Sequence, residues 1–271
     1  MGFLSGHCQI DEVKYLQACA LARHQRSLRC ENKDIVLWRL PRFDAWSRFR
    51  GSSVLVISGD RITMLRLRDF CADTVQMFRD TRTPVLFGLN PGKNGVPAGH
   101  TNVDILSSLV LQALRQNIHM NSDKSLTLAC GQFRRAETEN DWIDLLGMTL
   151  FNFPLVYIVV DLDLLCPPTT STLAGLTWLS MFQRLFDELH NHGAKSVVKV
   201  VMINRGSLHS TESERNAPTN FFISMPRTGR NTTGRMRDMP IIVGKGRNKY
   251  SSRWQQSELR LKMQQVRVQD G

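Results

Sequence analysis

Short apolar segments of strand length alternate with longer amphipathic segments through the middle of the chain. Residues 54–57, 83–89, 154–161 and 196–203 are rich in Val, Ile and Leu and are bounded by polar residues, Gly or Pro. Strands that are apolar on both faces are typical of a parallel sheet that helices cover on both sides. The sequence therefore predicts an α/β fold, a three-layer sandwich with a mostly parallel sheet, over residues 35–205.

The longer segments carry apolar residues at helical spacing. One of them follows Thr101, a favourable N-cap residue, and another ends just before Gly193. The helix predicted at residues 9–29 comes before the alternating part of the chain. We therefore expect residues 1–34 to form a separate N-terminal helical segment. Helices are predicted over residues 9–29, 62–80, 102–118, 136–151 and 174–192.

Basic residues are concentrated in the last part of the chain. The net charge is +11, but residues 1–203 hold 22 Lys and Arg against 19 Asp and Glu, whereas residues 204–271 hold 13 against 5. Residues 206–240 lack an apolar stripe and are typical of a mobile segment. We therefore predict a basic, largely irregular tail over residues 206–271. Within it, residues 239–243 are a candidate strand and residues 251–268 a candidate helix.

Composition indicates an intracellular protein without a membrane partner. No apolar run approaches the roughly 18 residues of a membrane span, and the start of the chain lacks the basic and apolar parts of a secretory signal. No Cys-x-x-Cys pair is present, so reduced thiols are expected and a zinc site is not. We expect a cytoplasmic location, with a nuclear one as the alternative. The six cysteines are at positions 8, 19, 30, 71, 130 and 166.

Residues 53–70 have the layout of a phosphate-binding loop without its chemistry. An apolar strand leads into Gly59 and then into an amphipathic helix. In the pattern G-x-x-x-x-G-K-[ST], the second glycine, the lysine and the hydroxyl are replaced by Met64, Leu65 and Arg66. The lysine reaches the terminal phosphates and the hydroxyl binds magnesium. We therefore expect no resident cofactor, and only weak binding of ATP or GTP with magnesium.

Further motifs follow in a fixed order along the chain. Arg42-Phe-Asp-Ala-Trp-Ser47 precedes the strand at 54–57, one later strand ends in Asp161-Leu-Asp163, and another ends in Asn204-Arg205. Together with residues 132–137 and Asp141-Trp142, this order resembles the NACHT branch of the STAND nucleotide-binding domains. The similar form is the degenerate fungal one, of the nephrocystin-3-like N-terminal type, in which an F-x-x-W element comes first. The resemblance covers about 170 residues and implies a sheet of the P-loop NTPase type.

The resemblance also implies roles for individual residues. Gly59 matches the first glycine of the phosphate loop, Asp161 the acid that holds magnesium, and Arg205 the arginine that follows the sensor strand and contacts a terminal phosphate. The acidic pair expected after Asp161 is Leu164-Leu165, and leucine cannot activate water, so no catalytic residue is predicted. The vestigial nucleotide site comprises Gly59, Arg66, Asp161, Asp163 and Arg205, with Asp161 as the candidate metal ligand.

Each of these polar residues also has a structural interpretation. Asp161 and Asp163 alternate at a strand end, which places their side chains on opposite faces, with Asp161 in a capping or loop role. Arg66 and Arg68 share a helix with acids at positions 69 and 73, so solvation or ion pairing with these acids explains them. Arg205 is then a surface arginine that follows a strand.

These features predict a non-catalytic, NACHT-like domain that serves as a scaffold for protein interaction, signalling or self-association. A weak nucleotide binder with a rewired loop, in which Arg66 replaces the lysine, is one alternative. A nucleic-acid-binding protein is another, because cations interleaved with Tyr250 and Trp254 suit phosphates and bases, although a solvated linker explains the same composition. The candidate nucleic-acid residues are Arg227, Arg230, Arg235, Arg237, Lys245, Arg247, Lys249 and Arg253.

Overall fold

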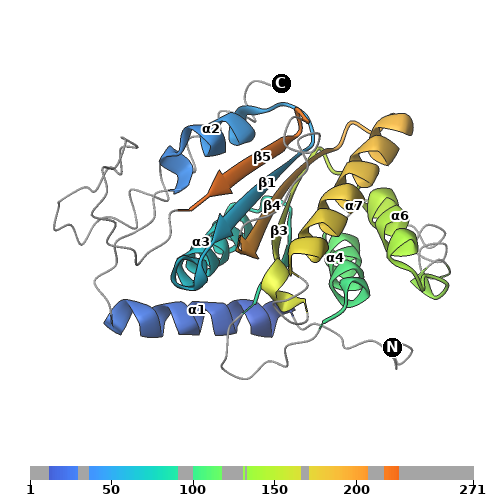
Figure 1. Ribbon diagram of the computed structural model, residues 1–271. Coiled ribbons are helices and arrows are strands. Elements are labelled where there is room, and N and C mark those ends of the chain that lie inside the picture. Colours follow the sequence, from blue (N-terminus) through green and yellow to red (C-terminus); the bar gives the residue numbers. More distant parts are fainter. Residues whose placement is uncertain are drawn as a thin grey trace.

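The computed structural model describes residues 12–29, 37–90, 100–117, 131, 133–165, 171–206 and 217–225. Its centre is a sheet of five parallel strands in the order β2-β3-β4-β1-β5, with helices on both faces (Figure 1). This confirms the predicted α/β fold with a parallel sheet. The strands are β1 (Ser53–Gly59), β2 (Val85–Gly88), β3 (Leu155–Asp161), β4 (Val197–Arg205) and β5 (Asn220–Ser224).

Strand register brings the polar strand ends together. β1 pairs with β4 from Ser53↔Lys199 to Gly59↔Arg205, and β3 pairs with β4 so that Asp161 lies opposite Ile203. All three strands run in the same direction, so their last residues meet at one border of the sheet. We call this border the carboxyl edge. It is where ligands bind in open α/β sheets.

Two apolar cores lie on the two faces of the sheet. Successive residues of β1 point to opposite faces, so that Val54 and Val56 join one core while Leu55 and Ile57 join the other. The second core also contains α3 (Arg61–Asp80), α2 (Pro41–Arg48) and the 3-10 turn η1 (Leu37–Arg39). The first core contains α4 (Asn102–Gln116), α6 (Glu139–Leu150) and α7 (Ser171–Asn191).

The remaining helix, α1 (Glu12–Arg29), corresponds to the helix predicted over 9–29. It runs across the carboxyl ends of the strands instead of along a face of the sheet (Figure 1). Tyr15 joins the core under α4, α6 and α7, whereas Leu16 and Cys19 join the core under α3. One helix therefore closes both cores at the carboxyl edge.

Two elements differ from the sequence-based expectations. Pro41 begins α2, which buries Phe43 and Trp46 beside the sheet, although only a motif was expected there. The interpretation of residues 206–240 as a mobile segment is wrong for Asn220–Ser224, because β5 pairs with β1 and extends the sheet. The candidate strand at 239–243 and the candidate helix at 251–268 lie outside the described residues.

The β2 edge of the sheet is closed by side chains. Gln112 in α4 both accepts a hydrogen bond from the backbone N–H of Phe87 and donates one to its carbonyl, each at 2.9 Å. Gln116, one turn later, does the same for Val85 at 3.2 and 2.9 Å. The two amides thus satisfy backbone groups that an edge strand would otherwise leave unpaired.

Lys199 is buried near the opposite, amino end of the sheet. Its side chain is about 2% exposed, and its ammonium donates to the carbonyls of Trp46 and Phe49 and to the hydroxyl of Ser53. Burial lowers the pKa of Lys199 to about 8. The lysine thus links the carboxyl end of α2 to β4. A positive charge at this place is favourable, because the last carbonyl groups of a helix carry partial negative charge.

Candidate functional site at the carboxyl edge

A buried ion cluster occupies the centre of the carboxyl edge. Arg68 in α3 donates from Nε to Oδ2 of Asp161 and from Nη2 to Oδ2 of Asp163, both at 2.7 Å. The other oxygen of Asp161 accepts a hydrogen bond from the backbone N–H of Asp163 at 3.0 Å. Asp161 is fully buried, and the Arg68 side chain is only 14% exposed. We call these three residues the Arg68 cluster.

Two sequence-based interpretations of this cluster are wrong. Asp161 and Asp163 do not point apart. Residues two positions apart in a strand share a face, so the expectation of opposite faces was mistaken, and the 3-10 turn η3 (Leu162–Leu164) after Asp161 leaves both carboxylates within reach of Arg68. Arg68 does not pair with the acids at 69 and 73 of its own helix. Those acids bind Arg26 and Arg23 of α1 instead, so Arg68 is left to face the sheet.

The electrostatics of the cluster are those of a buried ion pair. Burial raises the pKa of Asp161 to about 6, although the neighbouring charge of Arg68 acts to lower it. Burial alone would lower the pKa of Arg68, but the charge of Asp161 and its hydrogen bond outweigh burial and raise it. At neutral pH, Asp161 is therefore ionised and neutralised by a cation of its own chain.

Asp161, the candidate metal ligand, has both carboxylate oxygens in hydrogen bonds to protein groups. Within the residues that the structure describes, no group of three or more His, Cys, Asp or Glu side chains is arranged to hold a metal ion. The guanidinium of Arg68 lies where a cation bound by Asp161 would have to lie. A metal ion at Asp161 would therefore have to displace an arginine.

Gly59 allows the first turns of α3 to pack tightly against β1. A Cβ atom at this position would lie 3.1 Å from Cβ and Cγ2 of Thr63 and 3.2 Å from Cδ1 of Leu67. At such distances, Thr63 or Leu67 would have to shift by a few tenths of an ångström to admit a methyl group. Gly59 therefore has a role in helix–strand packing that is independent of any phosphate.

The amino terminus of α3 is occupied by a carboxylate. Asp60 is the N-cap residue, and its Oδ1 accepts a hydrogen bond from the backbone N–H of Thr63 at 2.8 Å. The N-terminus of a helix favours an anion, and in phosphate-binding loops that anion is the ligand. Here the chain supplies the negative charge itself.

The other predicted cations lie on the surface. Arg205 is next to Gly59 in the strand register, but its side chain is exposed, as is that of Arg66. The structure therefore brings Asp161 and Asp163 together with Arg68 and leaves Arg66 and Arg205 outside the cluster. Asn204, just before Arg205, is fully buried, and neither of its amide atoms has a hydrogen-bond partner within the described structure.

Helix α1 covers the Arg68 cluster. Cys19 is buried, and its thiol is close enough to Asp161 and Arg68 to sense their charges. Burial, followed by the charge of Asp161, raises the pKa of Cys19 to about 12. The thiol is thus protonated and unreactive at neutral pH, and it serves as a small apolar contact between α1 and the carboxyl edge.

Sequence reasoning missed Asp60 and Cys19 and did not find Asp161 and Asp163 as the partners of Arg68. Asp60 carried a usable signal, because an acid directly before an amphipathic helix is typical of an N-cap. Cys19 and Arg68 carried none, since their roles depend on how α1 docks on α3. Only the three-dimensional arrangement shows that these residues meet.

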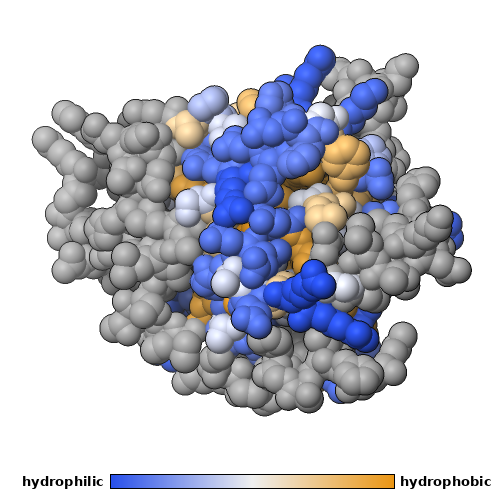
Figure 2. All heavy atoms as spheres, turned by 90° about the vertical axis from the view of Figure 1, so that its right-hand side faces the viewer, coloured by the Kyte–Doolittle hydropathy of each residue, from blue (hydrophilic) through white to orange (hydrophobic). Residues whose placement is uncertain are grey.

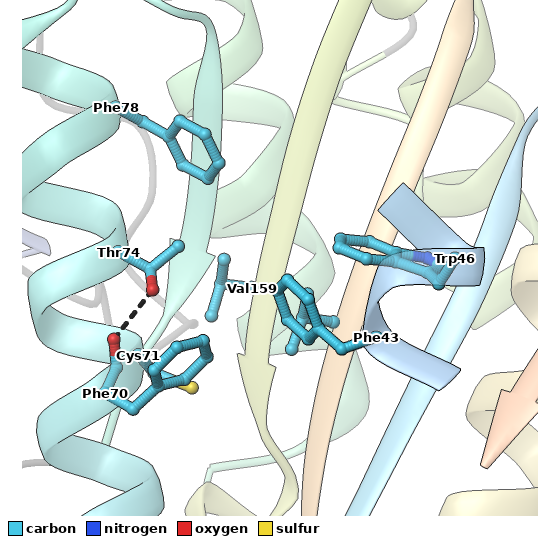
Figure 3. A pocket seen from close by; sticks show the side chains of 8 residues that line it. Phe43, Trp46, Phe70, Cys71, Thr74, Phe78 and Val159 are labelled. Atoms are coloured by element: carbon cyan, nitrogen blue, oxygen red, sulfur yellow. Dashed lines mark hydrogen bonds between the residues drawn. The ribbon is translucent and has the colours of Figure 1, made fainter. Parts of the chain in front are cut away.

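A small apolar cavity lies away from the cluster, between α2, α3 and the sheet (Figure 3). A water-sized sphere can move over only about 10 Å³ inside it, which is near the lower limit for one water molecule. The hydroxyl of Thr74 in its wall donates to the carbonyl of Phe70 at 2.8 Å. The cavity is therefore too small for a cofactor. Its lining residues are Phe43, Trp46, Phe70, Cys71, Thr74, Phe78, Val159 and Val201.

The face formed by α6 and α7 is mainly hydrophilic (Figure 2). Arg184 in α7 binds Asn140, Asp144 and Glu188 there, at distances of 2.7 to 3.1 Å. No described helix is both long and apolar enough to cross a membrane. The candidate nucleic-acid residues between positions 227 and 253 lie outside the described residues.

Comparison of the chain with protein-family models, with curated proteins and with solved structures finds no match. The geometry of the carboxyl edge is thus the main basis for a function.

Proposed function

We propose that the chain is a non-catalytic, NACHT-like domain with a P-loop type of sheet, which acts as a scaffold for protein interaction or signalling. The order of its motifs supports the family assignment. A parallel sheet with Gly59, Asp161 and Asn204-Arg205 at one edge is the arrangement that those motifs require. The non-catalytic character rests on what fills that edge.

The observation that carries the proposal is the bidentate contact of Arg68 with Asp161 and Asp163. A magnesium nucleotide needs a free carboxylate for the metal and free helix N–H groups for phosphate. In this chain Arg68 uses the carboxylate, and Asp60 uses the backbone N–H of Thr63. The guanidinium of Arg68 thus takes the place of the metal ion, and the carboxylate of Asp60 takes the place of a phosphate.

Titration with Mg-ATP tests the proposal. A ligand present at 100 times its dissociation constant stabilises the folded state by about 2.7 kcal/mol, or roughly 5–10 °C in Tm for a domain of this size. We expect 10 mM Mg-ATP to change the Tm by less than about 1 °C, with no phosphate release. A clear rise in Tm that disappears in the Asp161→Ala variant would overturn the non-catalytic assignment.

A further inference from the structure

The polar contacts between α1 and α3 are partly exposed ion pairs. Arg23 pairs with Asp73, and Arg26 with Asp69, with side chains that are between 22% and 40% exposed. The second pair is bidentate, with Nε of Arg26 at 3.2 Å from Oδ2 of Asp69. Ion pairs of this kind contribute little and are screened by salt. They orient α1 more than they fix it in place.

The buried side of α1 is a narrow stripe. Tyr15, Leu16, Cys19 and Ala22 are buried, whereas Leu21 is 59% exposed. An isolated helix of this length is marginal in water, so α1 needs a complementary surface to remain folded. That surface, which we call the α1 groove, is formed by α3 and the carboxyl edge. It includes Asp69, Asp73 and His100, and Nε2 of His100 lies 2.8 Å from the Tyr15 hydroxyl.

We propose that the α1 groove binds α1 of a second copy of this chain, so that two copies exchange their N-terminal helices. This rests on the proposed scaffold function, for which exchange provides the means of self-association. The partner helix is specified by the charge of its side chains and by their order along the helix. The pair Arg23–Asp73 and the pair Arg26–Asp69 run in opposite senses along the two helices, which defines an antiparallel helix with arginines three residues apart.

Exchange keeps every contact that holds α1. The same ion pairs, the Tyr15–His100 hydrogen bond and the same apolar stripe form between chains instead of within one, so the change in contacts is small. Eight peptide units join Arg29 to Leu37, so the connection between the two copies can extend to at most about 29 Å.

Charge reversal provides a sharp test. One variant carries Arg23→Asp with Arg26→Asp, and the other carries Asp69→Arg with Asp73→Arg. Each has like charges across its own α1 groove, but in an exchanged heterodimer both grooves are complementary. We expect each variant alone to be monomeric in native mass spectrometry, and an equimolar mixture of full-length chains to form a heterodimer that dissociates at high salt.

A matched control uses the hydrophilic face between α6 and α7. Arg184→Asp and Asp144→Arg reverse a pair of similar exposure, and mixing these variants should give no heterodimer. The variant that combines all four substitutions in α1 and α3 restores complementarity within one chain, so it should fold and dock like the wild type. A heterodimer from the α6–α7 control, or none from the α1 and α3 variants, overturns the exchange.

A second measurement keeps the test valid if a reversed variant fails to fold. Arg23→Cys and Asp73→Cys chains are mixed in a glutathione redox buffer, in which glutathione disulfide is the oxidant. We expect a reducible, disulfide-linked heterodimer that neither chain forms alone, and its absence overturns the exchange. If exchange fails while Mg-ATP still does not bind, only the inference about α1 falls. If Mg-ATP binds while heterodimers form, only the non-catalytic assignment falls.

Discussion

Nε of Arg68 lies 2.7 Å from Oδ2 of Asp161, so that the acid at the end of β3 is neutralised from within the fold. Both side chains are withdrawn from water, and α1 covers them. Removing one partner of such a pair leaves an uncompensated charge in a poorly solvated place, which is much more costly than loss of a surface pair.

Replacement of Arg68 by methionine is therefore expected to be severe. Arg68→Met should lower the free energy of unfolding by about 3–5 kcal/mol, because Asp161 then remains buried without its cation. Arg66→Met, two residues earlier and exposed, is the matched control and should change it by less than about 0.5 kcal/mol. Urea unfolding measures both. Equal effects of the two variants would show that the Arg68 cluster does not hold the carboxyl edge together.

The pKa of Asp161 predicts an unusual dependence of stability on pH. Its pKa is raised from 3.8 to about 6, so the folded state binds this proton more tightly than the unfolded state. The favourable contribution is present below about pH 4 and is lost as the pH rises through about 6. Relative to Asp161→Asn, the wild type should lose roughly 3 kcal/mol of unfolding free energy over this interval. A constant difference between the two proteins would contradict the raised pKa.

The lowered pKa of Lys199 predicts that stability rises with pH in the alkaline range, opposite to the effect of Asp161. Its pKa is lowered from 10.5 to about 8, so that the unfolded state binds this proton more tightly. Its contribution is favourable above about pH 10.5 and is lost as the pH falls through about 8. Compared with Lys199→Met, the wild type should therefore gain roughly 3 kcal/mol between pH 8 and 10.5. Chemical unfolding of both proteins at several pH values measures the change, and parallel curves would argue against it.

The hydrogen bonds of Gln112 and Gln116 are expected to protect the β2 edge against aggregation. In the double variant Gln112→Leu and Gln116→Leu, the backbone groups of Phe87 and Val85 lose their partners, at about 1–3 kcal/mol for each buried group. We expect lower stability and concentration-dependent aggregation, followed by light scattering. Gln76→Leu is the control, because Gln76 is exposed and its amide binds only a neighbouring side chain on α3. Aggregation of the control to the same extent would assign the effect to hydrophobicity alone.

Substitution of Gly59 distinguishes a packing role of this glycine from a role in ligand binding. Gly59→Ala should lower the free energy of unfolding by about 1–3 kcal/mol, because the added methyl group is forced against Thr63 and Leu67. Gly131→Ala is the control, since a Cβ there would meet no atom within 4 Å. Calorimetry measures the change in stability, and a Mg-ATP titration should show no difference between the variants. If Gly59→Ala were as stable as the wild type, the close approach of α3 would not explain the glycine.

The sequence contained most of the information that defines the sheet. The apolar segments at 54–57, 154–161 and 196–203 are β1, β3 and β4, which lie side by side and parallel as predicted. Their signal is strong because both faces of each strand are buried. β5 escaped prediction because it is a five-residue edge strand, in which Phe221 and Phe222 are only half-buried.

The candidate site was less predictable than the fold. Its polar residues at the strand ends were found, but their partners were not, because those depend on contacts between distant parts of the chain. Asp69 and Asp73 bind α1 and not Arg68, and nothing local to α3 distinguishes these possibilities. The turn after Asp161 decides where Asp163 points, and a strand pattern alone cannot reveal it.

The amides of Gln112 and Gln116 also limit how copies of this protein can assemble. A fibril that grows by adding strands needs two free borders on every copy, one for each neighbour. Because this sheet is sealed on its β2 side, strand addition at the other side joins two copies at most and then stops. Assemblies larger than a pair must therefore use surfaces other than the borders of the described sheet.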